Sequence, residues 1–117
     1  MKITNDMTEK AYEIAKKVYN GQIGRTEAKY EIAKKTGMND GSAGDYITDL
    51  LAMLEGKRYT RTLNTYATKY FLLNIKSDFG IDAFKKALNA TSEHIKYYNS
   101  LGHGNLNSIQ KVVDDLK

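Results

Sequence analysis

The sequence contains no cysteine, no proline and no tryptophan. Without cysteine, the chain has no disulfide framework, no thiol catalysis and no thiolate metal site. The lack of proline fits an all-helical chain whose helices run without kinks. Long apolar segments are also missing: no run approaches the ~20 residues of a membrane span, and the first residues, MKITNDMTEK, lack the apolar region of a signal peptide. We therefore expect a cytoplasmic protein that does not enter a membrane.

The length and composition of the chain predict one small domain with a mild excess of basic residues. The chain has 117 residues, of which 41% are hydrophobic, so we expect a single helical domain over residues 1–117. Nine tyrosines stand against three phenylalanines, and tyrosine suits half-exposed walls and interfaces because its apolar ring carries a polar tip. The 18 Lys and Arg against 14 Asp and Glu give a net charge of +4. This bias suits a polyanionic partner, although many proteins without one share it.

Apolar residues recur at helical spacing in six segments, and nothing alternates with period two for long enough to predict a strand. The expected helices cover about residues 7–19, 26–35, 42–55, 63–77, 81–100 and 106–116. Asp6, Thr26 and Ser42 are the expected N-caps of the first three, and a break near Thr91 and Ser92 is open. The sequence therefore predicts an all-α, compact bundle of five or six helices. A helix-turn-helix-like unit is expected at about residues 26–55, and the C-terminal helices at about 63–116.

The residues that carry chemistry are too few and too scattered for an enzyme. His94 and His103 have neither HxxxH nor HxxE spacing, and we interpret them as a surface and a loop histidine. The carboxylates lie among lysines, as on a solvated helical face, and no acid–base pair stands out. DGSAG, at residues 40–44, is not a nucleophile elbow after a strand. We therefore expect a binding module with no catalytic residue, no metal and no cofactor.

The segment TGMNDGSAGDYI, residues 36–47, has the spacing of a helix-turn-helix turn. Ala33 is small enough for a second helix to cross closely, and Gly37 tolerates the positive φ of the turn. The residues expected to dock the second helix are Met38, Ala43 and Tyr46. Tyr46 is larger than the usual aliphatic residue, and a turn one residue longer would place Ile47 inward instead. An ordinary helical hairpin with a glycine C-cap explains the same pattern.

The start of the third helix is polar, as expected of a recognition helix that offers its N-terminal residues to base edges. Asn39 can read adenine, and Ser42 can contact phosphate. Asp40 and Asp45 argue against this interpretation, because carboxylates repel phosphate.

The positive charge needed for DNA is expected from other segments. KRYTRT, residues 57–62, is the most basic short segment and supplies Lys57, Arg58 and Arg61. Within it, Tyr59 is expected to lie along a sugar-phosphate edge. Further charge around the second helix comes from Arg25, Lys34 and Lys35.

Four stretches of the chain resemble the N-terminal helical head domain of McrA-like restriction endonucleases. They are VYNGQIGRTEA, TGMNDGSAGDYI, MLEGKRYTRTLNTYATKYFL and DFGIDAFKKAL. In that family such a head precedes a C-terminal HNH nuclease, and the resemblance covers about residues 12–98. It implies a helical module that helps a modification-dependent nuclease to engage duplex DNA. The contact residues that it implies are Asn39, Ser42, Tyr46, Arg58, Tyr59, Arg61 and Asn64. The chain departs from the family in having no HNH metal motif.

Two functions follow as hypotheses from different classes. The first is non-enzymatic binding of double-stranded DNA, within or derived from a restriction system, with the start of the third helix in the major groove. The alternative is a protein-interaction module, such as a phage or mobile-element inhibitor of a host nuclease, of the anti-restriction or anti-CRISPR type. Its contact surface would be the tyrosine-rich faces of the helices at 63–77 and 81–100. The last helix has an apolar stripe that suits either the core or a second copy in a homodimer.

Overall fold

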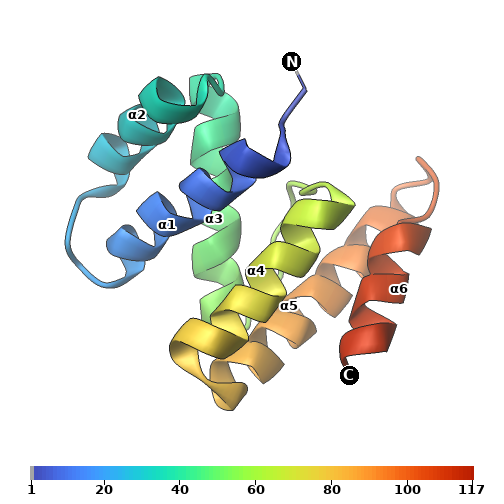
Figure 1. Ribbon diagram of the computed structural model, residues 1–117. Helices are drawn as coiled ribbons and strands as arrows, with labels where there is room; N and C mark the ends of the chain where they lie inside the picture. Colours follow the sequence, from blue (N-terminus) through green and yellow to red (C-terminus); the bar gives the residue numbers. More distant parts are fainter. Residues whose placement is uncertain (1) are drawn as a thin grey trace. The chain divides into compact units, whose positions relative to one another are not determined.

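The computed structural model describes residues 2–117, and within them the regular structure consists of six helices and no strand (Figure 1). The helices are α1 (Asn5–Tyr19), α2 (Arg25–Thr36), α3 (Asp40–Glu55), α4 (Thr65–Phe79), α5 (Ile81–Ser100) and α6 (Asn107–Leu116). The prediction of an all-α chain of five or six helices is confirmed. Helix α5 runs unbroken through Thr91 and Ser92, where the sequence had left a break open. No helix of residues 2–117 combines the length and apolar character needed to cross a membrane.

The chain divides into two compact units, which we describe separately. The N-terminal unit ends at Leu51, and the C-terminal unit covers Ala52–Lys117. Helix α3 therefore begins in the first unit and ends in the second. The expected single domain over residues 1–117 stays a prediction.

In the N-terminal unit, α1 packs against α2, and small residues allow the close approach (Figure 1). Ala11, Ala15 and Ala28 are fully buried on these two helices. The larger side chains of this core are Tyr12, Ile14, Ile32, Met38, Tyr46, Ile47 and Leu50. Burying a large apolar side chain stabilises a fold by about 1.5–3 kcal/mol, so this set holds the three helical segments together.

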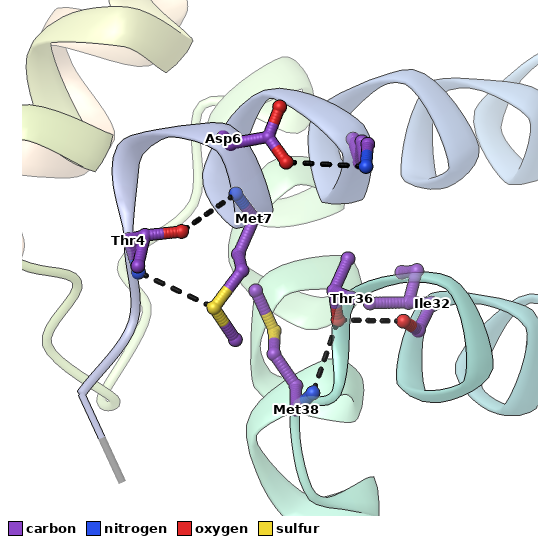
Figure 2. A network of polar contacts seen from close by, with 7 residues as sticks. Thr4, Asp6, Met7, Ile32, Thr36 and Met38 are labelled. Atoms are coloured by element: carbon purple, nitrogen blue, oxygen red, sulfur yellow. Dashed lines mark hydrogen bonds and ion pairs between the residues drawn. The ribbon is translucent and has the colours of Figure 1, made fainter.

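The first helix begins earlier than the sequence predicted, because its cap is Thr4 and not Asp6. The Thr4 hydroxyl accepts a hydrogen bond from the Met7 backbone N–H at 3.2 Å, and the Thr4 N–H donates to the Met7 sulfur at 3.3 Å (Figure 2). Asp6 lies in the first turn and pairs with Lys10 at 3.1 Å. A carboxylate in the first turn also interacts favourably with the positive end of the helix dipole. Thr26 is not a cap either, since α2 begins after Gly24 without a side-chain cap.

In the C-terminal unit, α4, α5 and α6 lie side by side and bury a second core (Figure 1). The residues buried on α4 and α5, which pack against each other, include Phe71, Leu72, Ile75, Phe84 and Ala87. The apolar stripe of α6 is used within this unit, where its buried members Ile109 and Val113 lie against Ile95 of α5. The homodimer therefore gains no support from this stripe and stays a prediction.

Candidate nucleic-acid interface

The turn between α2 and α3 is a defined structure. Gly37 has φ +84°, a left-handed conformation that glycine adopts without strain, and its N–H donates to the Ala33 carbonyl at 2.9 Å. The Thr36 hydroxyl donates to the Ile32 carbonyl at 2.6 Å and accepts from the Met38 N–H at 3.1 Å (Figure 2). Met38 is buried. Hydrogen bonds of the Gly37 N–H and of the Thr36 hydroxyl thus order the turn between the two helices.

The face of α3 that points inward contains both residues between which the sequence could not choose. Tyr46 and Ile47 are each buried, together with Ala43. The Tyr46 hydroxyl lies 3.4 Å from the Thr8 hydroxyl of α1, which gives the large side chain a polar partner. Burial raises the pKa of Tyr46, and the nearby Asp49 raises it further against the Thr8 hydrogen bond. Tyr46 is therefore a core residue. Its implied role as a DNA contact is wrong, because the side chain is buried.

The helix-turn-helix assignment stays a prediction, because an ordinary helical hairpin would bury the same residues. The expected polar contacts at the start of α3 are also changed. The Asn39 side-chain oxygen accepts from the Ser42 N–H at 2.7 Å, so Asn39 is the capping residue and the Ser42 hydroxyl is not. Bidentate reading of adenine needs both the oxygen and the NH₂ of an asparagine. Base reading by Asn39 would therefore have to share this oxygen with the cap.

A groove of about 380 Å³ runs between α2 and the start of α3. Its cationic lining residues, Arg25 and Lys29, are matched by the carboxylates Asp40 and Asp45. The Arg25 guanidinium donates to the Thr48 hydroxyl across the groove. Because each cation is balanced by an anion, this groove attracts a polyanion weakly.

The two units differ in charge as a whole. Up to Leu51 the sequence has eight Lys and Arg against eight Asp and Glu. From Ala52 onward it has ten against six, so the entire net charge of +4 lies in the C-terminal unit. In the N-terminal unit the predicted contact Lys35 also pairs with Glu31 at 3.1 Å. The strongest attraction for phosphate is therefore expected from the C-terminal unit.

Residues 57–62, which we call the basic strap, carry the exposed cations of this unit's candidate site. Lys57, Arg58 and Arg61 are all exposed. Lys57 lies 3.3 Å from the Glu55 carboxylate, an exposed pair of little energetic weight. The Arg58 guanidinium lies over the ring of Tyr97, 4.5 Å from its centroid. The structure thus brings together three of the predicted contact residues on one short segment.

A buried histidine holds the basic strap against α5. His94 is only 1% exposed; its Nδ1 lies 2.8 Å from the Tyr59 carbonyl oxygen and its Nε2 lies 3.0 Å from the Thr62 hydroxyl. A carbonyl can only accept, so Nδ1 carries the proton and Nε2 accepts from Thr62. Burial lowers the pKa of His94 and the charge of Arg58 lowers it further, against the Tyr59 hydrogen bond. The interpretation of His94 as a surface histidine is wrong.

Tyr59 is the second anchor of the strap. Its ring stacks on that of His94, with centroids 4.4 Å apart, and its hydroxyl donates to Thr91 at 3.2 Å. The side chain is 3% exposed. The prediction that Tyr59 lies along a sugar-phosphate edge is therefore wrong, because the ring is part of the core.

Asn64 and Asn89 fix the two ends of the strap region. Asn64 caps α4 by accepting from the Ala67 N–H at 2.8 Å, so its implied DNA contact competes with a structural role. The Asn89 side chain donates to the Gly56 carbonyl at 3.3 Å. Sequence reasoning missed the anchors on α5. Their signal was the spacing of Thr91 and His94, which places both on one helical face.

Nothing among residues 2–117 groups three carboxylate or imidazole side chains closely enough to hold a metal ion. The chain matches no family model, and no curated protein or solved structure is significantly similar to it. The structure itself defines an all-α chain with a neutral N-terminal unit and a basic C-terminal unit.

Proposed function

We propose that this chain is a non-enzymatic module that binds double-stranded DNA, with the basic strap as its phosphate-contacting surface. One observation carries the proposal: three exposed cations occupy a six-residue segment of the unit that holds the entire net charge. The link to a restriction system rests on the sequence resemblance to McrA-like head domains.

The way in which the strap is held supports this role. Its backbone is bound at Tyr59 and its side chains at Thr62 and Tyr59, all through α5. Arg58 is further restrained over the Tyr97 ring. Cations presented from an ordered backbone lose less conformational entropy on binding than cations on a flexible loop. The guanidinium groups of Arg58 and Arg61 can also donate two parallel hydrogen bonds to a phosphate.

In this proposal the start of α3 positions the DNA and discriminates between bases, and it contributes little to the affinity for phosphate. Asp40 and Asp45 line its groove, and they oppose close approach of phosphate. A base edge would be accepted there only if the phosphates were held elsewhere.

The proposal is tested by salt-dependent binding of a fluorescent duplex. The double variant Arg58→Ala/Arg61→Ala should weaken binding at least tenfold and reduce the slope of log K against log salt by about 2, since each neutralised phosphate contributes ~0.9. The matched control is Lys10→Ala/Lys17→Ala on α1, which removes the same charge from exposed positions of the other unit. The control should bind nearly as the parent does. Absence of binding at low salt, or equal losses in both variants, would refute the proposal.

A second function is favoured by a separate observation, an exposed apolar stripe on α4. Tyr66 and Leu73 are 37% and 41% exposed, and Tyr70 lies between them with its ring stacked on Tyr66 at 5.9 Å. These positions are four and three residues apart, so they share one helical face. Such a stripe suits a protein partner, as expected for an inhibitor of a nuclease. A complex with a nuclease that survives high salt and is lost in Leu73→Glu would support this alternative.

A further inference from the structure

A second groove lies beside the basic strap, within the C-terminal unit. It has a volume of about 420 Å³, in the range of roughly 300–1,000 Å³ that small-ligand sites occupy. The strap forms one wall with Thr60, Arg61 and Thr62, and α5 and the residue after it form the other with Tyr97, Tyr98 and Leu101. One wall is polar and cationic, and the other is aromatic and apolar.

We infer that this groove receives an unpaired base of a nucleic-acid strand whose phosphates lie on the strap. The inference rests on the proposed function for the position of the phosphates. A nucleotide has the same two-sided chemistry as the groove, with an aromatic base joined to an anionic phosphate. Bases of single strands, bulges and extruded nucleotides are commonly bound by stacking on tyrosine or arginine side chains.

The aromatic wall is already ordered. The Tyr98 ring contacts two histidine rings in tilted arrangements, with centroids 6.4 Å from that of His94 and 6.3 Å from that of His103. Tilted contacts of this kind are favourable for aromatic pairs. On the opposite wall, Thr62 is fixed by its hydrogen bond to His94. A base entering the groove therefore meets side chains that are already restrained, which lowers the entropy lost on binding.

The charge of the groove distinguishes it from the groove between α2 and α3. None of the six side chains that line the strap groove is acidic, whereas Asp40 and Asp45 line the other. Arg61 lines the strap groove directly, and Arg58 lies over Tyr97. Leu101 is 45% exposed at the end of the apolar wall. This combination of cations and exposed apolar surface favours a nucleotide over a neutral or cationic ligand.

The test uses two duplexes that differ by one unpaired nucleotide. A duplex with a single bulged 2-aminopurine should bind about tenfold tighter than its fully paired counterpart, the size expected for one stacked base. The fluorescence of 2-aminopurine should change on binding, because the base leaves its stacked neighbours in the duplex and enters the groove. Equal affinity for the two duplexes, or a fluorescence that stays constant, would overturn the inference.

Variants of the aromatic wall complete the test. Tyr97→Leu should remove the preference for the bulged duplex, while Tyr97→Phe should keep it because the ring remains. Leu101→Glu should also weaken the preference, since it places a charge on the apolar wall that the base would contact. The matched control is Tyr66→Leu, a half-exposed tyrosine on α4 that does not line the groove. Thermal melting of each variant shows whether the unit is still folded, and a preference kept in a folded Tyr97→Leu would contradict the inference.

The two proposals fail in different ways. If a paired duplex binds through Arg58 and Arg61 but the bulge brings no preference, the groove inference fails and duplex binding stands. If neither duplex binds but a single strand does, and Tyr97→Leu weakens it, duplex binding fails and the groove stands.

Discussion

The two units each present a groove of similar volume, and the difference between them lies in charge and anchoring. The groove of the N-terminal unit sets Arg25 and Lys29 against Asp40 and Asp45, and the unit as a whole is neutral. The groove of the C-terminal unit has Arg61 and no carboxylate in its lining. The α2–α3 segment, which has the spacing of a helix-turn-helix turn, is thus the poorer partner for a polyanion. A backbone arrangement and a charge distribution are separate requirements, and in this chain different units meet them.

The units also differ in how buried polar groups are used. In the N-terminal unit the contact between Tyr46 and Thr8 joins two side chains that both belong to helices. In the C-terminal unit, His94 and Tyr59 join a helix to a segment with no regular structure of its own. A segment without internal hydrogen bonds depends on such contacts to stay ordered. The strap should therefore be the part of the molecule most sensitive to loss of a single polar side chain.

The largest effect is expected from His94→Ala. The change removes two hydrogen bonds and a ring stack, leaves a cavity in the core, and should cost about 2–4 kcal/mol of unfolding free energy. Urea unfolding measures the loss. The control His103→Ala lies in the exposed loop, and its effect should stay within about 0.5 kcal/mol. Equal stability of the two variants would show that His94 does not hold the strap.

A smaller effect is expected from protonation of the same residue. The pKa of His94 is lowered in the folded state from its ordinary value of 6.5, so the unfolded chain binds the proton more readily. The contribution of neutral His94 to the free energy of unfolding should be fully present above pH 6.5. It should be lost as the pH falls from 6.5 through the lowered pKa. Urea unfolding at a series of pH values measures this slope. His94→Gln should flatten it, and an unchanged slope in that variant would assign the pH dependence to other groups.

The next effect is the loss of unfolding free energy when the hydroxyl of Tyr59 or of Tyr46 is removed. Tyr59→Phe removes a hydrogen bond of 3.2 Å to a buried threonine and should cost about 1 kcal/mol. Tyr46→Phe removes a contact of 3.4 Å and should cost less. Equilibrium unfolding of both variants tests the order. The reverse order would mean that the N-terminal unit depends more on its buried polar contact than the strap does.

These residues also show where sequence reasoning succeeds and where it stops. The helices could be predicted because apolar periodicity and glycine stops are local signals, and Gly37 adopts the left-handed conformation that its place after Ala33 indicated. Asn39 and Asn64 could not be identified as caps from residue type alone, since the same amide suits a base edge. The burial of Tyr59 depends on contacts with residues 32 and 35 positions away. The basic segment has no periodicity that would reveal such contacts.

The smallest effect is expected at Gly44, whose surroundings differ from those of Gly56. A Cβ at Gly44 of α3 would meet only the Lys29 side chain at 3.5 Å, an ordinary contact. Gly56 has φ +73°, and a Cβ there would lie 3.3 Å from the Lys86 side chain. Gly44→Ala should therefore stabilise the chain by about 0.5–1 kcal/mol through helix propensity. Gly56→Ala should destabilise it because the left-handed conformation strains any residue with a Cβ.

The Gly44→Ala variant also tests whether the N-terminal unit contributes to binding. Gly44→Ala adds a methyl group to the groove at the start of α3 and leaves the strap unchanged. If the strap alone grips DNA, duplex affinity should stay within about twofold of the parent while the melting temperature rises. If the start of α3 is pressed against the DNA, affinity should fall although the protein is more stable. Anisotropy titrations and thermal melting of the one variant, read together, thus decide whether the neutral unit takes any part in binding.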